Sequence, residues 1–533
     1  MPAIFLALLA YSAAPAYDTV VVCPREMRGS LAPWIEHRTR QGHSIGLMDT
    51  SNSPEQVRRG IRDAARGKSL RYVVLVGDAP LVQRPAEANS RQVPTHYQKA
   101  TVVSRFGSEP TIATDNWYAD LDDDALPDVA IGRITADNPA ELDLIVGKIL
   151  DYERSADFGM WRRHVNFVAG LGGFGTLVDA AIEAGAKKLI TDGVPGGYST
   201  TLTYASLSSP YCPEPRDFSR TICQRLNEGC LFWVYMGHGG TRGLDWLSVP
   251  GGRYPVLAAE DMATLNCMSG APIACLLSCY AGAFDASEDC LAEHMLRTRG
   301  APVAVLCGSR VTMPYAMAVL GNELLDACFA QRKPTLGECL LVAKRRMAAD
   351  TVTGRSMASE NRRALDTLAR LASPPPADLE AERREHLHLF NLIGDPCLRV
   401  RYGERVELAA LAKPAAGDRL LVTGSSPLDG DATVEVVARR DRMTFKPPRR
   451  SAYDGSARAA EELNATYRRA NDLRYGQQQW ETKKGPFRVE VPLAPDASGP
   501  CHVRVFVRGA SDFALGSRDL TIEPAPSATT AAR

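Results

Sequence analysis

The chain has 533 residues, of which 45% are hydrophobic and 23% charged, and its 62 Lys and Arg side chains balance its 62 Asp and Glu side chains. This composition is that of an ordinary globular protein with two or more domains, and it excludes a fibrous or a largely disordered chain. The zero net charge provides no overall field for nucleic acid or an anionic membrane, so we expect a partner that is recognised locally and is not a nucleic acid.

The first sixteen residues have the pattern of an export signal. An apolar run from Ile4 to Ala10 precedes Ala14-Pro15-Ala16, which is the small-x-small pattern of a signal-peptidase site. We therefore expect residues 1–16 to be a signal peptide and the protein to be secreted, periplasmic or attached to the cell surface. Because no Lys or Arg precedes the run, an alternative start codon or a buried first strand stays open. The run is too short for a stable membrane span.

Residues 17–402 alternate between β-rich apolar runs and helical stretches. The apolar runs lie at 18–23, 72–78, 128–134, 165–170, 230–237, 271–279, 300–308 and 388–400, with helices expected at 139–154 and 176–190. Continuous apolar strands are typical of a parallel sheet that helices cover on both faces, which predicts an α/β fold with a mostly parallel sheet. The pattern restarts after residue 155, which indicates two subdomains, about 17–155 and 156–402, or one sheet made of two halves.

Beyond residue 402 the sequence changes to short alternating runs, which predict a C-terminal β-sandwich over 403–523. A basic and partly helical stretch at about 439–484 is expected to be a solvated insertion in this sandwich. We expect residues 524–533 to form a disordered tail.

Thirteen cysteines leave at least one thiol unpaired. We expect several buried thiols, such as Cys275 and Cys307, and leave open one or two disulfides. No paired C-x-x-C motif of a zinc site is present, and no H-E-x-x-H helix supports a metalloenzyme.

Two predicted strands end in residues that can carry out nucleophilic chemistry. His238 lies in the segment YMGHGG after one strand, and Cys279 ends the next one. Because parallel strands deliver their carboxyl ends to one edge of the sheet, these two side chains are expected to face one another. An imidazole next to a thiol favours the thiolate, which attacks carbonyls, and it can then protonate the leaving amine. The backbone amides of Gly239 and Cys279 are candidate donors to the oxyanion.

Taken alone, a histidine in a Gly-rich turn and a cysteine at a strand end are more often structural residues. The surrounding motifs, however, resemble those of the gingipain-type peptidases: Y-x-G-H-G, a Trp at 246, a strand ending in Cys followed by Phe284-Asp285, a helix with Cys290 and Glu293, TDNWYADLDDDALPDVAIGRI and NLIGDP. The resemblance covers roughly residues 18–402. It implies a caspase-like fold, a following immunoglobulin-like domain, endopeptidase activity on proteins or peptides, Cys279 as nucleophile and His238 as its base, with Trp246 as a candidate wall of the substrate cleft.

The sequence departs from this family in three ways. The stretch 169–175 has no acid to orient the histidine, and the nearest carboxylate, Asp179, is either that orienting group, part of a specificity pocket or an exposed helical residue. The segment 308–315 offers Arg310 and no acid, so a preference for basic residues cannot be carried over. No room is left for an N-terminal prodomain, which implies another activation mechanism or none.

Asp120, Asp122 and Asp124 have the alternate spacing by which a loop turns several carboxylates towards one hard cation. The resemblance implies a structural Ca²⁺ here, and a solvated acidic turn is the equal alternative. No cofactor is expected to take part in the chemistry.

Two other functions stay open at this point. The missing orienting acid and prodomain are compatible with a catalytically weak or inactive peptidase-like binding or scaffold protein. Another cysteine hydrolase or a transpeptidase of the same fold would use the same nucleophile and base.

Overall fold

The computed structural model describes residues 17–67, 69–80, 90–171, 187–188, 190–350, 354–372, 378–410, 413–450 and 452–524. The predicted signal peptide, most of the predicted tail and most of the helix expected at 176–190 therefore lie outside the described residues. None of the described helices is both long and apolar enough to cross a membrane.

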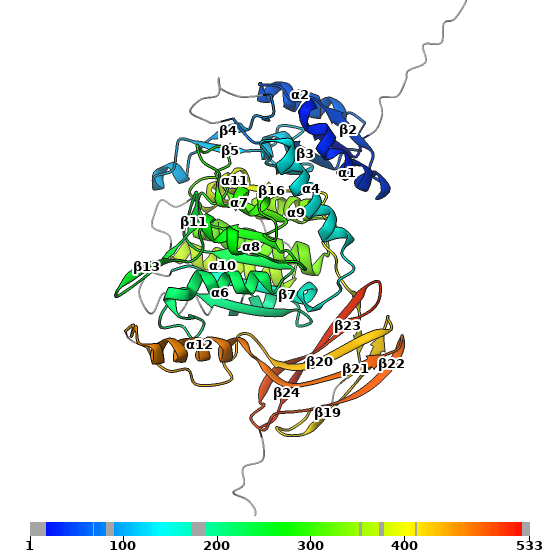
Figure 1. Ribbon diagram of the computed structural model, residues 1–533, viewed down its shortest axis with the longest axis vertical. Helices are drawn as coiled ribbons and strands as arrows, with labels where there is room; N and C mark the ends of the chain where they lie inside the picture. The colour runs from blue at the N-terminus through cyan, green and yellow to red at the C-terminus, as the bar shows by residue number, and fades with distance from the viewer. Residues whose placement is uncertain are drawn as a thin grey trace, which may run out of the picture.

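A ten-stranded sheet runs through the α/β part of the molecule, in the order β2-β1-β3-β6-β16-β15-β14-β9-β7-β8 (Figure 1). Five strands form one half: β1 (Thr19–Val22), β2 (Ile45–Met48), β3 (Tyr72–Val76), β6 (Ala130–Ile134) and β16 (Phe390–Ile393). Five form the other half: β7 (His164–Ala169), β8 (Ser199–Tyr204), β9 (Phe232–Met236), β14 (Ile273–Leu277) and β15 (Ala304–Gly308). The mostly parallel sheet is confirmed. The two halves form one continuous sheet, and β16, from the second predicted subdomain, belongs to the first half; the subdomain bounds stay a prediction.

The two halves run in opposite directions. Strands are parallel to their neighbours within each half, and the one antiparallel pairing of the ten strands joins β15 to β16, with Val305 opposite Ile393. The carboxyl ends of β7, β9 and β14 consequently lie at one edge of the sheet, and those of β1, β3 and β6 lie at the other.

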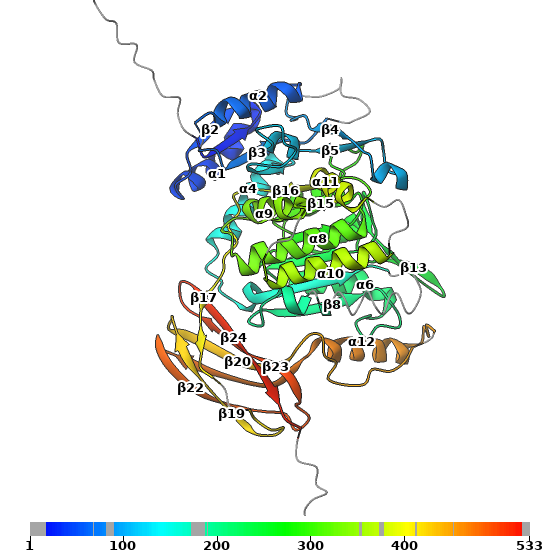
Figure 2. The same cartoon turned by 180° about the vertical axis from the view of Figure 1, so that it is seen from behind.

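Helices cover both faces of the sheet because its strands are apolar on both sides. Val21 of β1 packs in the same cluster as Trp34, whereas Val20 and Val22 pack with Ile61, which places the helices of Trp34 and Ile61 on opposite faces. One group of helices comprises α1 (Arg28–Arg40), α4 (Pro139–Arg154) and α7 (Leu291–Arg297). The other comprises α2 (Pro54–Ala65), α3 (Asn116–Ala119), α8 (Pro314–Leu325), α9 (Leu336–Ala348), α10 (Met357–Ala372) and α11 (Leu379–Leu389), of which α8 to α11 lie in front in Figure 2.

Helix α4 shows how the local sequence fixes an element. The Asn138 side chain accepts a hydrogen bond from the Glu141 amide at 3.1 Å, and Pro139 occupies the first turn, where no intrahelical donor is lost. Apolar residues at helical spacing, including Leu142, Ile145 and Ile149, are fully buried against the sheet.

Smaller elements surround the second half of the sheet. They are α6 (Phe218–Asn227) and three short hairpins: β4 (His96–Lys99) with β5 (Thr111–Thr114), β10 (Gly239–Gly240) with β11 (Gly243–Leu244), and β12 (Trp246–Val249) with β13 (Gly252–Pro255). The last two hairpins follow β9 directly and project beyond the sheet (Figure 1).

Two further sheets form the C-terminal part, at the lower end of the molecule in Figure 1. The five-stranded sheet contains β17 (Glu404–Arg405), β24 (Phe513–Ile522), β23 (Gly499–Arg508), β20 (Gly430–Ala438) and β21 (Arg474–Thr482). The three-stranded sheet contains β18 (Glu407–Leu408), β19 (Arg419–Ser426) and β22 (Gly485–Pro492). They share one apolar core, and an immunoglobulin-like topology stays a prediction.

The excursion from these sheets is shorter than the predicted insertion 439–484. Residues 457–471 form the helix α12, but β21 pairs with β20 along its length and belongs to the sheet. Its polar residues hid this strand in the sequence. Helix α12 covers the edge strand β8, where Asn471 accepts a hydrogen bond from the Leu202 amide at 2.8 Å and donates one to the Leu202 carbonyl at 3.0 Å. This protects an open sheet edge from pairing with another chain.

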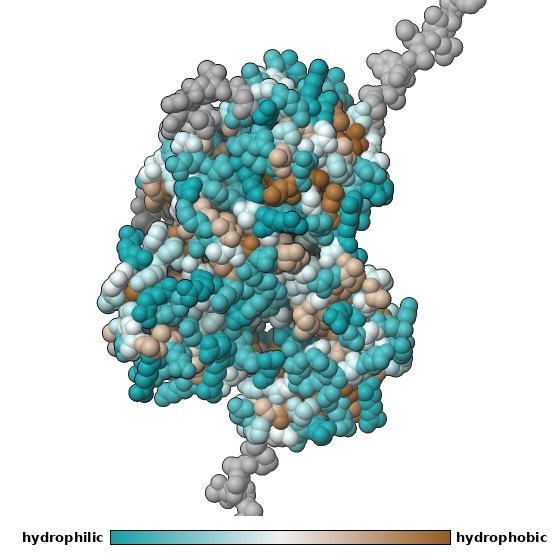
Figure 3. Space-filling model, viewed as in Figure 1, coloured by the Kyte–Doolittle hydropathy of each residue, from teal (hydrophilic) through white to brown (hydrophobic). Residues whose placement is uncertain are grey.

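The surface seen in Figure 3 is mainly hydrophilic, and its hydrophobic residues lie in small separate groups. Such scattered groups are ordinary for a globular protein.

Candidate active site

His238 and Cys279 follow neighbouring strands in register. Met236, at the end of β9, is paired with Leu277, at the end of the parallel strand β14, and the Gly237 amide donates to the Leu277 carbonyl at 3.3 Å. His238 and Cys279 each come two residues later. Because side chains alternate along strands, this register directs both residues to the same side of the sheet at its carboxyl edge.

The loop of His238 is held by its neighbours rather than by its own side chain. The buried Tyr235 hydroxyl donates a hydrogen bond to the His238 carbonyl at 2.7 Å. The imidazole of His238 is exposed and makes no hydrogen bond to a described residue. It is therefore accessible to a ligand at the sheet edge.

Glycine is required next to this histidine. A Cβ on Gly239 would lie 2.6 Å from the Cys279 carbonyl oxygen and 2.8 Å from Ser278 Oγ, closer than real Cβ atoms approach. The glycine thus lets the histidine loop and the cysteine loop touch through their backbones.

The Cys279 sulfur is half-buried and accepts a hydrogen bond from the Thr312 amide at 3.3 Å. The sulfur also lies 3.5 Å from the Thr312 hydroxyl and 3.8 Å from the Thr312 carbonyl, so one residue holds it in place. Tyr280, the next residue, has a φ of 56°, a left-handed conformation that is uncommon for a residue other than glycine. Its amide donates to the Arg310 carbonyl at 3.2 Å, and Ala281 donates to the Cys279 carbonyl at 2.7 Å. These bonds hold the turn that presents the sulfur.

The two amides expected to bind an oxyanion are both available. No described residue accepts a hydrogen bond from the Cys279 amide. Gly239 lies opposite Leu244 in the β10–β11 hairpin, and the Leu244 amide donates to Leu257 instead of to Gly239. Antiparallel pairs alternate between bonded and non-bonded types, and this one is non-bonded.

A carboxylate that sequence reasoning missed lies beside the histidine loop. Asp245 Oδ2 accepts a hydrogen bond from the Leu171 amide at 2.8 Å, and its Oδ1 accepts one from the Trp246 amide at 2.9 Å. A Cβ on Gly170 would lie 3.2 Å from Asp245 Oδ2 and 3.1 Å from the Cα of Gly237. Asp245, from the turn after β11, thus places a carboxylate against Gly170 and Leu171, in the segment 169–175 where the sequence has no acid. The sequence signal was an aspartate between the two hairpins that follow the His motif.

Of the two further candidate residues, Trp246 and Asp179, the structure describes only Trp246. Trp246 lies on the β12 strand next to Asp245, is 46% exposed and has the Arg253 guanidinium over its ring at 5.7 Å. Its proposed role as a cleft wall stays a prediction. Asp179 lies outside the described residues.

Arg310 does not line an open pocket. It is buried and forms a two-pronged ion pair with Asp285, with distances of 2.8 and 2.6 Å. The Phe284-Asp285 motif therefore anchors the segment that carries Thr312.

Asp120, Asp122 and Asp124 have carboxylate oxygens within 4.8 Å of one another. They fit a cation only in part, because Asp120 already lies 3.3 Å from the Arg58 guanidinium and accepts a hydrogen bond from the Asp123 amide at 2.8 Å. Asp124 accepts one from the Leu126 amide at 2.8 Å. The calcium site stays a prediction.

All thirteen cysteines lie among the described residues, and all are free thiols. The disulfides left open by the sequence are therefore not formed. Cys279 is partly accessible, whereas the other twelve are buried. Burial raises the pKa of the Cys223 and Cys267 thiols to about 11 and that of Cys275 to about 12. Chemical reactivity is thus concentrated at one sulfur.

Comparison with known proteins gives a family and a fold. Residues 12–401 match the model of peptidase family C25. No curated protein matches the chain.

Solved structures extend the likeness to nearly the whole chain. The crystal structure of the Arg-specific cysteine proteinase gingipain R (RgpB) is 15% identical, with a TM-score of 0.53 over 95% of this chain and 98% of that one. The complex of the pro- and mature domains of RgpB from Porphyromonas gingivalis is also 15% identical, with a TM-score of 0.51 over 95% of this chain and 100% of the other. At this identity the likeness shows a shared fold.

Proposed function

The chain belongs to peptidase family C25, the gingipain-like cysteine peptidases, and on that premise we propose that it is an endopeptidase with Cys279 as nucleophile and His238 as general acid and base. Its substrates are proteins or peptides. The observation that carries the proposal is the register of β9 and β14, which brings two residues of the right chemistry to one strand edge.

The reaction proceeds in two halves. The His238 imidazole takes the thiol proton, and the Cys279 sulfur attacks the scissile carbonyl carbon to form a tetrahedral intermediate. His238 then gives the proton to the amine as the C–N bond breaks, which leaves a thioester on Cys279. Water attacks this thioester, again with His238 as the base, and releases the carboxylate and the free thiol.

The oxyanion is stabilised by backbone amides. Those of Gly239 and Cys279 have no described acceptor and belong to two loops that touch at the Cys279 carbonyl, so they are suited to the negative oxygen of the tetrahedral intermediate. A donor of this kind contributes about 3 to 4 kcal/mol of transition-state stabilisation in other enzymes.

Asp245 is proposed as the positioning residue of His238. It is half-buried and fixed by two amides at the base of the histidine loop, so its negative charge is held in one place. A fixed carboxylate near an imidazole stabilises the imidazolium that forms when the thiol is deprotonated. With Asp245 in this place, the proposed peptidase does not need an acid within segment 169–175.

The residues around Arg310 support no preference for basic side chains, because its charge is already matched by Asp285. Export by the N-terminal signal is part of the proposal. A mature N-terminus at Tyr17, read by sequencing the purified protein, is the expected result.

The test is an endopeptidase assay of the wild type against Cys279→Ala, in the presence of a reductant. Cys223→Ala, which removes a buried thiol on α6, is the matched control and should keep its activity. Loss of cleavage in Cys279→Ala alone supports the proposal. Cleavage that survives in Cys279→Ala, or a wild type that cleaves no protein although Cys279 reacts with alkylating agents, overturns it and favours a binding role.

A further inference from the structure

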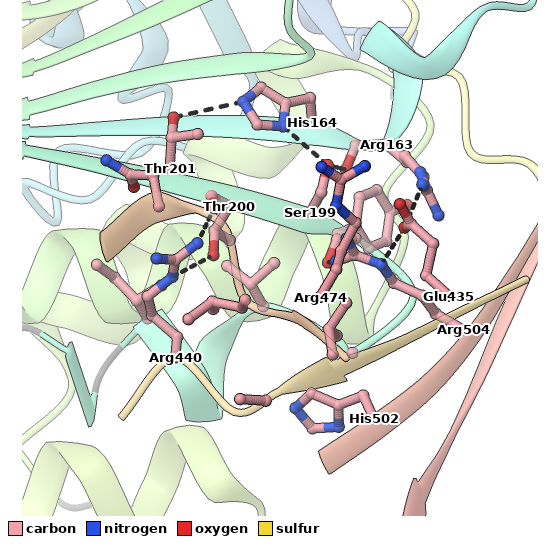
Figure 4. A pocket seen from close by; sticks show the side chains of 18 of the residues that line it. Arg163, His164, Ser199, Thr200, Thr201, Glu435, Arg440, Arg474, His502 and Arg504 are labelled. Atoms are coloured by element: carbon pink, nitrogen blue, oxygen red, sulfur yellow. Dashed lines mark hydrogen bonds and ion pairs between the residues drawn. The ribbon is translucent and has the colours of Figure 1, made fainter. Parts of the chain in front are cut away.

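A pocket lies between the sheet and the C-terminal part of the chain, far from the candidate catalytic edge. It has a volume of about 340 Å³ and is entered between strands β7 and β8 on one side and β20, β23 and the end of α12 on the other. Its sheet residues, from His164 and Ser199 to Thr201, start β7 and β8, whereas the proposed catalytic residues follow the carboxyl end of β9. We call this space the arginine pocket (Figure 4).

The lining of the arginine pocket is strongly cationic. It contains six guanidinium groups and two carboxylates, Glu435 and Asp472. The six are Arg163, Arg225, Arg440, Arg468, Arg474 and Arg504. The chain as a whole is neutral, so this excess is a local feature.

The two carboxylates do not neutralise this charge. Glu435 is shared, since it lies 2.6 Å from Arg163 and 2.8 Å from Arg504. Asp472 pairs with Arg474 at 2.9 Å. Arg225 pairs with Glu228, which does not line the pocket, at 2.9 Å. Arg440 and Arg468 form no ion pair with a described carboxylate.

Arg440 is the clearest case. The residue is only 7% exposed. Its guanidinium donates hydrogen bonds to neutral oxygens: the Thr200 hydroxyl at 3.1 Å, the Thr200 carbonyl, and the Ala470 carbonyl at 3.4 Å. It forms no ion pair with a described residue. A buried charge without a counter-ion is costly, so an anion nearby would stabilise it.

The pKa values of two arginines also reflect the crowding of positive charge in the pocket. Burial and the nearby Arg504 lower the pKa of the Arg163 guanidinium to about 10, although Glu435 opposes the change. Burial, and to a lesser degree Arg504, also lowers the pKa of Arg440. A negative ligand beside these two guanidinium groups would raise their pKa values back towards the ordinary range.

We propose that the arginine pocket binds a multiply charged oxyanion, a phosphate or sulfate group that is either free or part of a larger ligand. Guanidinium groups match the oxygens of such anions in pairs of hydrogen bonds. The Thr200 hydroxyl lies beside Arg440 in Figure 4, whereas the Ser199 and Thr201 hydroxyls contact His164. The volume accommodates a group larger than a single phosphate.

The bound anion would hold two parts of the molecule together. Arg440, Arg474 and Arg504 come from the C-terminal part, whereas Arg163 directly precedes β7 and Thr200 lies on β8. A ligand between them adds contacts to both, so binding should raise the melting temperature. The proposal is independent of peptidase activity.

The experiment uses the full chain and pyrophosphate as the probe, at constant ionic strength set with NaCl. We expect a dissociation constant measurable by calorimetry and a rise in melting temperature of about 3 °C or more at saturation. Sulfate should produce a smaller rise of the same kind, and acetate none. A sugar phosphate that binds more tightly than free phosphate would assign the site to an ester ligand, and equal binding would assign it to the free ion.

The variant pair is chosen among exposed residues so that folding is retained. Arg468→Gln with Arg474→Gln removes two charges from the pocket, and should raise the dissociation constant for pyrophosphate about tenfold or more. Arg419→Gln with Arg458→Gln removes two exposed charges elsewhere and should leave it within about twofold. No binding by the folded wild type, or equal weakening in both double variants, overturns the proposal. Cys279→Ala should bind as the wild type does.

Discussion

The Tyr235 hydroxyl donates a hydrogen bond to the carbonyl of His238 at 2.7 Å. Tyr235 belongs to the buried strand β9, and His238 to the turn that follows it. The bond therefore ties the position of the candidate base to the rigid sheet. Burial, together with the nearby charge of Asp245, raises the pKa of the Tyr235 phenol well above its usual range. The hydroxyl therefore stays a donor at every physiological pH.

Removal of this donor should affect catalysis more than folding. In Tyr235→Phe the His238 carbonyl loses one hydrogen bond, which is worth about 1 kcal/mol, while the aromatic packing is retained. We expect kcat/KM to fall about tenfold with a melting temperature within about 4 °C of the wild type. Peptidase kinetics and thermal unfolding on the same samples check this. An unchanged kcat/KM would show that the loop does not depend on this bond.

Alkylation should mark a single thiol. Because Cys279 is accessible and the other twelve cysteines are buried, iodoacetamide at mildly acidic pH should label Cys279 first. His238→Ala should slow this labelling at least about tenfold, since the thiolate loses its partner. Mass spectrometry of peptides at short reaction times gives the answer. Comparable labelling of several thiols in the folded protein would contradict the proposed pair.

Asp245→Asn tests the positioning role. The amide keeps the size of the side chain but removes the charge, so kcat should fall about tenfold while KM stays within about twofold. Asp245→Glu should recover part of the loss in kcat.

The control for Asp245 is Asp261→Asn, which removes a carboxylate that also accepts a backbone hydrogen bond, from Ala258 at 2.9 Å. It should leave kcat within about twofold of the wild type. A purely structural role for Asp245 would lower the melting temperature of Asp245→Asn without a selective loss of kcat.

His386 makes stability depend on pH. Its Nε2 accepts a hydrogen bond from the Met313 amide at 2.8 Å, next to Thr312, and burial lowers its pKa from 6.5 to about 4. The unfolded chain binds more protons between these values, so stability is complete above about pH 6.5 and is lost as the pH falls towards 4. The loss is on the order of 3 kcal/mol.

His386→Gln removes this titration and keeps an acceptor for the Met313 amide. Between pH 6.5 and 4 its free energy of unfolding, measured with urea, should fall less steeply than that of the wild type. His502→Gln, a histidine removed from the partly exposed surface beside Asp519, is the matched control. Parallel curves for the wild type and His386→Gln would refute the assignment.

Calcium should stabilise the loop of Asp120, Asp122 and Asp124. Three carboxylates whose oxygens lie within 4.8 Å repel one another, and a divalent cation relieves this repulsion. We expect a chelator to lower the melting temperature by several degrees and Asp122→Asn to abolish the difference. Identical unfolding with and without calcium would show that Arg58, Arg62 and the backbone amides stabilise the loop without a cation.

The sequence predicted the strands that are buried on both faces, because helices on either side require continuous apolar runs. It missed β8 and β21, which lie at sheet edges and carry polar residues such as Thr200, Thr201 and Gln477 to Gln479. An edge strand needs no full apolar pattern, since one side or one end faces water. The amino-acid composition of β15 and β16 did not predict that these two strands run in opposite directions.

For the site, the order of motifs was enough to expect His238 and Cys279 at one edge. The amide of Thr312 at the sulfur and the carboxylate of Asp245 at Leu171 could not be predicted, because both contacts join loops distant in the sequence. The arginine pocket was equally hidden, since its six arginines come from segments between residues 163 and 504.

The opposed directions of the two sheet halves have a consequence for how such a protein can diversify. The loop after β6 emerges on the side away from Cys279, so insertions there can lengthen without crowding a substrate. The longer segment after β3 returns towards the site, where Glu109 accepts a hydrogen bond from the Tyr280 hydroxyl at 2.9 Å. Loops after β9, β14 and β15 have no such freedom, because each contributes atoms within reach of the sulfur or the imidazole. New surface functions should therefore accumulate on the first side, and new cleavage preferences on the second.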